Sequence, residues 1–470
     1  MLTIRDFGDS RNCQGVSRRD FLRIGSLGLG GLSLPGLLAA KAQASSVGQS
    51  ITDKAVIFLF LQGGPSHIEL FDPKMDAGSD IRSTTGEVAT RIPGVTFGGT
   101  FPQMADRADR LAVVRSYASG NADHSYQAVM AAGNPLKASM SSLYTRVAGA
   151  NHPQTGMPTN ALITPEAIRP DLKLKGNFET SALPTLTSPG ELGAQYGAFN
   201  PVGGSQLKEN MELRIPRERF LDRQQLLAGL DRIKRTADID GPMGGVDQYQ
   251  QQAFDVITRG VSEAFDLSKE DPRTIARYDT TKVFAAERLN KYNDMYRSSN
   301  LLGHQLLMAR RLCERGCGFV TVSDCGWDMH GNSNSLPQLT GIEPLGRQVD
   351  HAVSALIDDL AERGLTNKIL LVITGEMGRT PKINRQGGRD HYAALTSLVF
   401  AGGGLRMGQV IGQSDRIASK PATDPYGPEN LMATVFNTVL DPAEVRLQTG
   451  LPTQLIKAVE TGQPIEPLFS

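Results

Sequence analysis

The sequence predicts an α/β fold with a largely parallel central sheet and helices on both faces. Residues 54–61 form a continuous apolar run, which is typical of a strand buried on both faces, as in a parallel sheet. Residues 342–363 carry apolar side chains at helical spacing and lie between two more strand-like runs, 318–323 and 368–374. A strand, a helix and a strand in this order indicate a βαβ unit, whose two strands are parallel.

Two further apolar runs, 111–115 and 395–401, are predicted as strands of the same sheet. The helix over 342–363 is expected to stop at Gly364, because glycine readily adopts the left-handed conformation that closes a helix. These elements place the sheet in a domain that spans residues 45–470.

Residues 170–310 differ from the rest of this domain. They are polar and rich in Gln, Arg, Lys and Asp, with helical patterns over 218–236 and 276–314. We interpret them as a helical insertion or cap on the sheet.

Residues 1–44 are predicted to be an export signal. Residues 18–22 read Arg-Arg-Asp-Phe-Leu, and the apolar stretch 24–40 that follows has 17 residues with five Gly and one Pro. A membrane span needs about 20 apolar residues, so this stretch is a poor span, and residues 42–44 offer an Ala-x-Ala cleavage site. The segment resembles a twin-arginine signal, which implies the twin-arginine translocation machinery as a partner, a periplasmic location and no membrane span after cleavage. The alternative is a buried or membrane-anchoring helix.

The charge balance argues against a nucleic-acid-binding protein. The whole chain has 49 basic and 49 acidic residues, and without residues 1–44 it has 43 and 46, a net charge of −3. Binding to nucleic acid normally needs a basic excess or a basic stripe.

The cysteines do not form a metal or redox motif. Beyond residue 44 the chain has Cys313, Cys317 and Cys325, and none is in a C-x-x-C spacing. An odd number in an exported protein means at least one free thiol or an intermolecular bridge, and the pairing stays open.

Polar residues follow the predicted strands, at the edge where α/β sheets bind their ligands. Four histidines lie in these segments, at positions His67, His124, His330 and His391. Asp328 and His330 are two residues apart in an extended segment, so their side chains project on the same side, and Asp390 with His391 forms a second pair. Carboxylate and imidazole together suit Zn, Mn or Fe. A single loop histidine, by contrast, is usually only a polar surface residue.

Three arginines in the same segments, Arg115, Arg379 and Arg389, could hold an oxyanion such as phosphate or sulfate. The alternative is that they form ordinary salt bridges.

Several motifs resemble a bacterial family known only as domain of unknown function 1501. They are residues 63–67 with 71–74, then 327–331, 375–381 and 388–391. The motifs span nearly the whole exported chain in the family's order. The family is similar to the alkaline phosphatase and sulfatase superfamily, which implies an alkaline-phosphatase-like fold and a metal-dependent ester hydrolase.

The resemblance implies a divalent metal, such as Zn, Mn or Ca. The residues placed to hold it are Asp328, His330, Glu376, Asp390 and His391. Two positions depart from the superfamily: Met377 stands where an imidazole is expected, and Gln62 where a metal-binding Asp is expected. His67 or Asp72 could compensate, and a single metal ion is expected rather than two.

The resemblance also implies a nucleophile in the segment after the second strand. Ser125 is the candidate, with Ser116 in reserve, and the alternative role of Ser125 is a helix N-cap. Arg379 or Arg115 would hold the non-bridging oxygens.

Two functions therefore remain open from the sequence. The first is an exported, sulfatase-like hydrolase of phosphate or sulfate esters, acting on a small molecule or a polysaccharide. The second is a catalytically degenerate envelope protein of the same fold that binds a ligand or partner.

Overall fold

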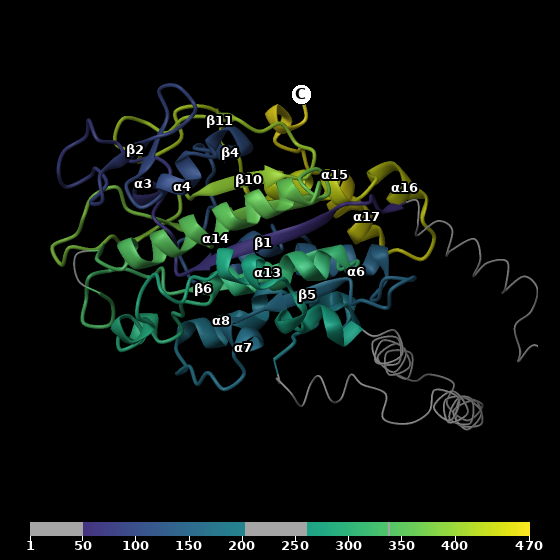
Figure 1. The fold of residues 1–470 in the computed structure, drawn as a ribbon. Helices are drawn as coiled ribbons and strands as arrows, with labels where there is room; N and C mark the ends of the chain where they lie inside the picture. Colours follow the sequence, from purple (N-terminus) through teal and green to yellow (C-terminus); the bar gives the residue numbers. More distant parts are fainter. Residues whose placement is uncertain (1–49, 203–260, 337–338) are drawn as a thin grey trace, which may run out of the picture.

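The computed structural model describes residues 50–202, 261–336 and 339–470. In this part of the chain a seven-stranded sheet lies between two layers of helices (Figure 1). The predicted signal 1–44 and the predicted helix 218–236 lie outside the described residues.

The sheet has the strand order β11-β4-β10-β7-β1-β6-β5. Its strands are β1 (Ala55–Gln62), β4 (Leu111–Val114), β5 (Asn160–Ile163), β6 (Phe319–Cys325), β7 (Ile369–Thr374), β10 (Leu398–Gly402) and β11 (Gln409–Ile411). β1 pairs in parallel with both β6 and β7, β5 pairs in parallel with β6, and β11 with β4. Only β10 is antiparallel to its neighbours, β4 and β7. The predicted α/β fold with a largely parallel sheet is confirmed.

The central strand β1 shows why both faces of the sheet are covered. All eight of its residues are buried, and successive side chains point to opposite faces. Ile57 and Leu59 belong to one core cluster, whereas Phe58 and Phe60 belong to the other. The continuous apolar run that predicts this strand therefore reflects two separate cores.

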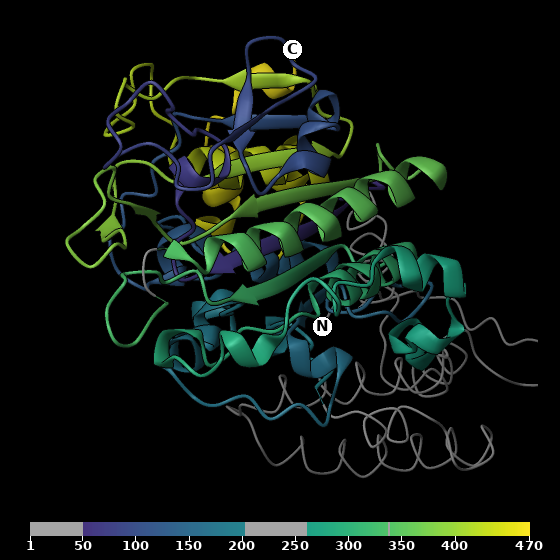
Figure 2. The same ribbon diagram turned by 60° about the vertical axis from the view of Figure 1, so that its left-hand side comes forward.

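The two helical layers are built from helices that alternate along the sequence. The first layer contains α4 (Pro102–Ala105), α7 (Pro165–Ile168), α13 (Leu302–Glu314) and α14 (Ile342–Glu362), and the second contains α5 (Tyr126–Met130), α6 (Met140–Ala148), α8 (Phe178–Leu186), α15 (Pro428–Val439), α16 (Pro442–Leu447) and α17 (Thr453–Glu460). Figure 2 shows α14, in green, and the C-terminal helices, in yellow, on opposite sides of the sheet. The remaining short elements are α3 (His67–Leu70), α12 (Pro272–Arg277), β2 (Glu87–Ala89), β3 (Thr96–Gly98), β8 (Gly378–Arg379) and β9 (His391–Tyr392).

The strand directions bring several chain segments to one edge. The carboxyl ends of β1, β6 and β7 lie at this edge, and so does the amino end of the antiparallel β10. The loops that leave β6 and β7 and the loop that enters β10 therefore meet there, as expected for a ligand site in an α/β sheet.

Some expectations about the helices are corrected. The predicted helix over 276–314 is continuous only in α13, and residues 278–301 form short turns instead. α14 ends at Glu362, and Gly364 follows with φ +68°, as predicted.

A search of the described helices for a membrane span finds none with the length and apolar character that a span requires. Cys313, Cys317 and Cys325 are all free thiols.

A candidate metal centre

Five side chains from four segments meet at the carboxyl edge of the sheet. Asp328 and His330 follow β6, Glu376 follows β7, and His391 precedes β10. His124 comes from the segment between β4 and α5. Asp328 contacts each of the three imidazoles, and Glu376 contacts His124. We call these five residues the His/Asp cluster.

Asp328 is the centre of this cluster. Its Oδ1 lies 2.9 Å from His330 Nε2 and 3.3 Å from His391 Nε2, and its Oδ2 lies 3.5 Å from His124 Nε2. Arg379 also donates to Oδ1. Burial alone would raise the pKa of Asp328, but the charge of Arg379 and the hydrogen bonds from the histidines outweigh it and hold that pKa far below the ordinary value. Asp328 is therefore an ionised carboxylate.

His124 joins the two carboxylates. Its Nδ1 lies 2.9 Å from Oε1 of Glu376, and its ring stacks on Phe178 with 3.9 Å between ring centroids. Burial lowers the pKa of His124, but hydrogen bonds to Asp328 and Glu376 outweigh this and raise it to about 9. Without a competing cation, the imidazole therefore carries a proton at neutral pH.

The other two imidazoles are oriented by their outer nitrogens. His391 Nδ1 lies 2.9 Å from the carbonyl oxygen of Ala122, which can only accept, so this nitrogen donates. His330 Nδ1 lies 3.6 Å from Oδ1 of Asp390. An outer carbonyl that orients a ring by a hydrogen bond, as Ala122 orients His391, is typical of metal-ligating histidines.

The residues of the cluster fit a metal ion. Ligand atoms of His124, Asp328 and His391 all lie within 4.8 Å of one another. Glu376 is fully buried, yet its Oε2 has no hydrogen-bond partner among the described residues. A buried carboxylate oxygen without a partner is costly unless a cation, a water molecule or a donor completes it. Two imidazoles and a carboxylate form a ligand set that Zn and Mn accept.

The predicted metal residues are thus largely brought together. Asp328, His330, Glu376 and His391 belong to the cluster, whereas the Asp390 carboxylate is 58% exposed and lies behind His330. His124 was named among the strand-end histidines but not in the predicted metal set, because its segment resembles the one that carries the superfamily's nucleophile. Its position after the predicted strand 111–115 was the signal that could have found it.

The three arginines are engaged with protein groups. Arg379 is buried and donates to Asp328 and to the carbonyl oxygens of Gly63, Gly64 and Arg389. Arg389 forms a fully buried ion pair with Glu69, at 2.7 Å. The salt-bridge alternative therefore describes both side chains in this structure.

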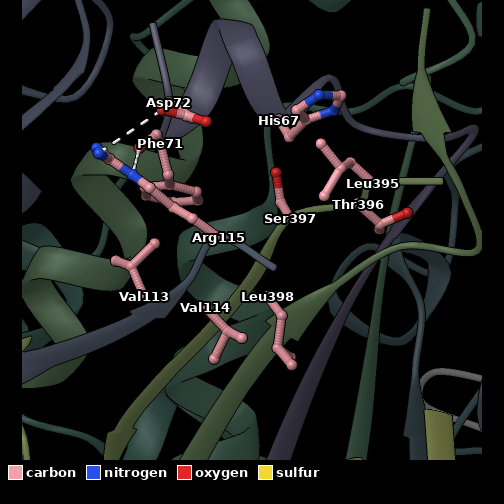
Figure 3. A pocket seen from close by; sticks show the side chains of 10 residues that line it. All are labelled: His67, Phe71, Asp72, Val113, Val114, Arg115, Leu395, Thr396, Ser397 and Leu398. Atoms are coloured by element: carbon pink, nitrogen blue, oxygen red, sulfur yellow. Dashed lines mark hydrogen bonds and ion pairs between the residues drawn. The ribbon is translucent and has the colours of Figure 1, made fainter. Parts of the chain in front are cut away.

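Arg115 lies apart from the cluster. Its guanidinium donates to the carbonyl oxygens of Phe71 and Thr96 and faces Asp72 at 3.6 Å (Figure 3). Arg115 follows β4, and β10 lies between β4 and β7, the sheet strand that precedes Arg379. The structure thus does not bring Arg115 and Arg379 together around one oxyanion.

His67 and Asp72 do not replace the missing ligand at Gln62. Both line a separate cavity of about 10 Å³, roughly the room of one water molecule, together with Arg115 and Ser397 (Figure 3). The buried His67 donates from Nε2 to the carbonyl oxygen of Ala418, and burial lowers its pKa to about 4. His67 is therefore a neutral core histidine.

The two candidate nucleophiles differ in access. Ser125 is exposed and is the N-cap residue of α5, but its side chain makes no capping hydrogen bond. Ser116 is buried near the end of β4, away from the cluster.

Met377, which stands where an imidazole is expected, is fully buried and packs against Gly64.

The chain was compared with known proteins. Residues 53–469 match the family described as Protein of unknown function (DUF1501). No curated protein matches the chain.

Several solved structures are similar to the chain at low sequence identity. The PsFucS1 sulfatase from Pseudoalteromonas sp. is 13% identical, with 90% of this chain and 76% of that chain covered and a TM-score of 0.35. The phosphonate monoester hydrolase SpPMH from Silicibacter pomeroyi is 13% identical, with 88% and 76% covered and a TM-score of 0.33. The Bacteroides thetaiotaomicron protein BT33494S-sulf, described under metabolism of multiple glycosaminoglycans, is 11% identical, with 88% and 76% covered and a TM-score of 0.32.

Proposed function

The chain belongs to the DUF1501 family, as its motifs predicted, and we propose that it is an exported, metal-dependent hydrolase of phosphate or sulfate esters. One observation carries the proposal: His124, Asp328 and His391 offer ligand atoms within 4.8 Å of one another at the carboxyl edge of the sheet. The ionised carboxylate of Asp328, which Arg379 holds in place, supports it.

The proposed metal ligands are His124, Asp328 and His391, bordered by His330 and Glu376. The imidazoles favour Zn or Mn over Ca, because Ca takes oxygen ligands almost alone. A bound divalent cation would supply Lewis-acid polarisation of an ester oxygen. Arg379 is assigned the role of holding Asp328 ionised and in place.

Ser125 remains the proposed nucleophile. It follows His124 directly in the chain, and its exposed hydroxyl is not used for helix capping. Its attack on phosphorus or sulfur would release the alcohol of the ester, and water would then hydrolyse the covalent intermediate. A water molecule that attacks directly is the alternative, and Ser125→Ala separates the two, since only the first route needs the hydroxyl.

The test is a screen of generic aryl phosphates and aryl sulfates with added Zn, Mn or Ca. We expect turnover that needs Zn or Mn and that falls by roughly 100-fold or more in Asp328→Ala. Asp53→Ala is the matched control, because the side chain of Asp53 is 74% exposed and pairs with Lys368. Turnover that is equal in Asp328→Ala, or insensitive to chelation, would exclude this site as the catalytic centre.

A second function is favoured by two positions. Gln62 ends β1 where the superfamily has an acidic ligand, and Met377 replaces an imidazole. A catalytically degenerate envelope protein of the same fold would bind metal or an oxyanion ester without turning it over. Binding of an aryl phosphate or sulfate without hydrolysis, in the presence of Zn or Mn, would favour this second function.

Export is a separate part of the proposal. The Arg-Arg-Asp-Phe-Leu sequence at 18–22 supports passage through the twin-arginine machinery to the periplasm. Replacement of Arg18 and Arg19 by lysine should keep the precursor in the cytoplasm. An unchanged distribution between cell fractions would contradict this route.

A further inference from the structure

Only one of the two carboxylate oxygens of Glu376 has hydrogen-bond partners among the described residues. Oε1 accepts from the backbone N–H of Gly63 at 2.9 Å and lies 2.9 Å from His124 Nδ1. Oε2 is buried and has no hydrogen-bond partner among the described residues. Since Oε1 orients His124, whatever holds Oε2 also fixes the geometry of the cluster.

Tyr126 has a hydroxyl group that is a hydrogen-bond donor without an acceptor among the described residues, on the side of β1 that carries Phe60. Its side chain is fully buried, and the phenol hydroxyl has no partner within the described chain. Its ring packs on Phe60 of β1 with 5.1 Å between centroids, and Phe60 is in register with Thr374, two residues before Glu376. His124, two residues before Tyr126, already contacts the Glu376 carboxylate.

The segment that carries Tyr126 is tied to Glu376 at a second point. Asn121 donates from Nδ2 to the backbone carbonyl of Glu376 at 3.2 Å. The chain from 121 to 126 is therefore held against the residue that follows β7, and Tyr126 enters the core from it.

Gln62 supplies a second free donor. Its Oε1 accepts from the Cys325 thiol at 2.6 Å, which leaves Nε2 buried without a partner in the described part of the chain. Gln62 lies two residues beyond Phe60 on β1, so its side chain points to the same face as Phe60, the face on which Tyr126 packs. The next residue, Gly63, donates to Glu376.

We propose that Tyr126 and Gln62 are positioning residues that hold Oε2 of Glu376 through one buried water molecule. Two donors without acceptors and one acceptor without donors lie around the end of β1, and three polar partners are what a buried water typically has. The contact itself does not depend on the proposed hydrolase, but its consequence for metal binding rests on that function.

The other buried carboxylate near Tyr126 already has a donor on each oxygen, unlike Oε2 of Glu376. Glu179 is buried nearby on α8, but its Oε1 accepts from the Gly326 N–H at 2.9 Å and its Oε2 from Asn177 at 3.3 Å. A phenol with its ordinary pKa of about 10 keeps its proton at neutral pH, so the Tyr126 hydroxyl is a donor.

The experiment compares Tyr126→Phe with Tyr117→Phe. Tyr117 is the matched control, because it too is fully buried and its hydroxyl has no partner among the described residues, but it lies beside Tyr426, beyond β4. Both variants delete one hydroxyl, so a merely structural role predicts equal effects. We expect Tyr126→Phe to weaken Zn or Mn affinity, measured by calorimetry, about tenfold, and Tyr117→Phe to leave it unchanged.

A crystal structure of the metal-free chain and of Tyr126→Phe gives the second readout. We expect density that joins the Tyr126 hydroxyl to Glu376 through one water, and a Glu376 carboxylate that turns in the variant. A Tyr126 hydroxyl bound to any other group, or equal metal affinities in the two variants, would overturn the proposal. If the wild-type chain binds no metal, the proposed function fails, and the density still decides the contact.

Discussion

The Nε2 atoms of His330 and His391 lie 3.0 Å apart, although the residues are 61 positions apart in the sequence. The outer nitrogen of His391 donates to Ala122, and that of His330 faces Asp390. Both inner nitrogens therefore turn toward Oδ1 of Asp328. Two imidazole nitrogens and a carboxylate oxygen thus converge on one point, as the ligands of a divalent cation do, and this relationship underlies the following predictions.

Asp390→Asn tests the outer shell of the cluster. The change removes the negative charge behind His330 Nδ1 but keeps an oxygen that can accept from Asn384 Nδ2. We expect Zn affinity to fall about tenfold with little change in thermal stability. Asp80→Asn is the control, since Asp80 is 49% exposed and pairs with Lys382. An equal affinity in both variants would remove Asp390 from the cluster's support.

Metal binding should release a proton from His124. The pKa of this imidazole is raised to about 9, so it is protonated at pH 7.5, whereas a metal ligand must be neutral. Metal affinity should therefore rise with pH until about 9 and level off above it. Calorimetry in buffers with different ionisation enthalpies measures the proton count. His124→Gln should abolish this release, and release that persists in the variant would assign it to another group.

Gly63→Ala should disrupt the cluster through the backbone. A Cβ at Gly63 would lie 2.4 Å from the Asp328 backbone nitrogen, and its φ of +112° disfavours any side chain. Gly364→Ala is the control, because its φ is +68° and a Cβ there meets nothing within 4 Å. Both variants carry backbone strain of about 1 kcal/mol. Only Gly63→Ala should also lose metal binding, so loss in neither or in both would contradict the steric reason.

Glu270 should stabilise the first helical layer in a pH-dependent way. It accepts from Arg310 at 2.8 Å, Arg311 at 2.9 Å and Arg363 at 3.2 Å. Burial would raise the pKa of Glu270, but bonds from Arg311 and Arg310 outweigh it and lower that pKa to about 2. Its contribution is therefore fully present above about pH 4.5 and is lost as the pH falls through about 2.

Denaturant unfolding measures this contribution. Glu270→Gln should lower the free energy of unfolding by roughly 3 kcal/mol at pH 7, with a smaller difference at low pH. Glu343→Gln, whose carboxylate is 65% exposed beside Arg347, should cost less than about 0.5 kcal/mol. Equal losses in the two variants would show that the arginine contacts of Glu270 add nothing.

Much of the fold was predictable because buried strands leave long apolar runs. The runs at 54–61 and 368–374 correspond to β1 and β7, and each boundary agrees to within one residue. The short strands β5 and β11 were missed, since four or three residues carry too little pattern. The antiparallel direction of β10 could not be predicted either, because an apolar run looks the same whichever way the strand runs relative to its neighbours.

The sequence could predict only which site residues lie at the ends of strands, and not how those ends are arranged in the sheet. Asp328, His330 and His391 were found because they follow or precede buried runs. Apolar runs do not indicate the order of strands in the sheet. Arg115 was therefore grouped with the site residues, although three strands separate β4, which Arg115 follows, from β6. The partners of Arg379 and Arg389 come from segments 51 and 320 residues away, and no local pattern indicates them.

The most direct test of the metal centre is the metal content of the folded full chain after incubation with Zn or Mn and removal of the excess. We predict about one ion per chain in the wild type and in His351→Ala, a histidine on α14. His124→Ala and His391→Ala should each lose most of it while remaining folded. A wild-type chain without bound metal, or equal content in all variants, would contradict the assignment of this cluster as a metal centre.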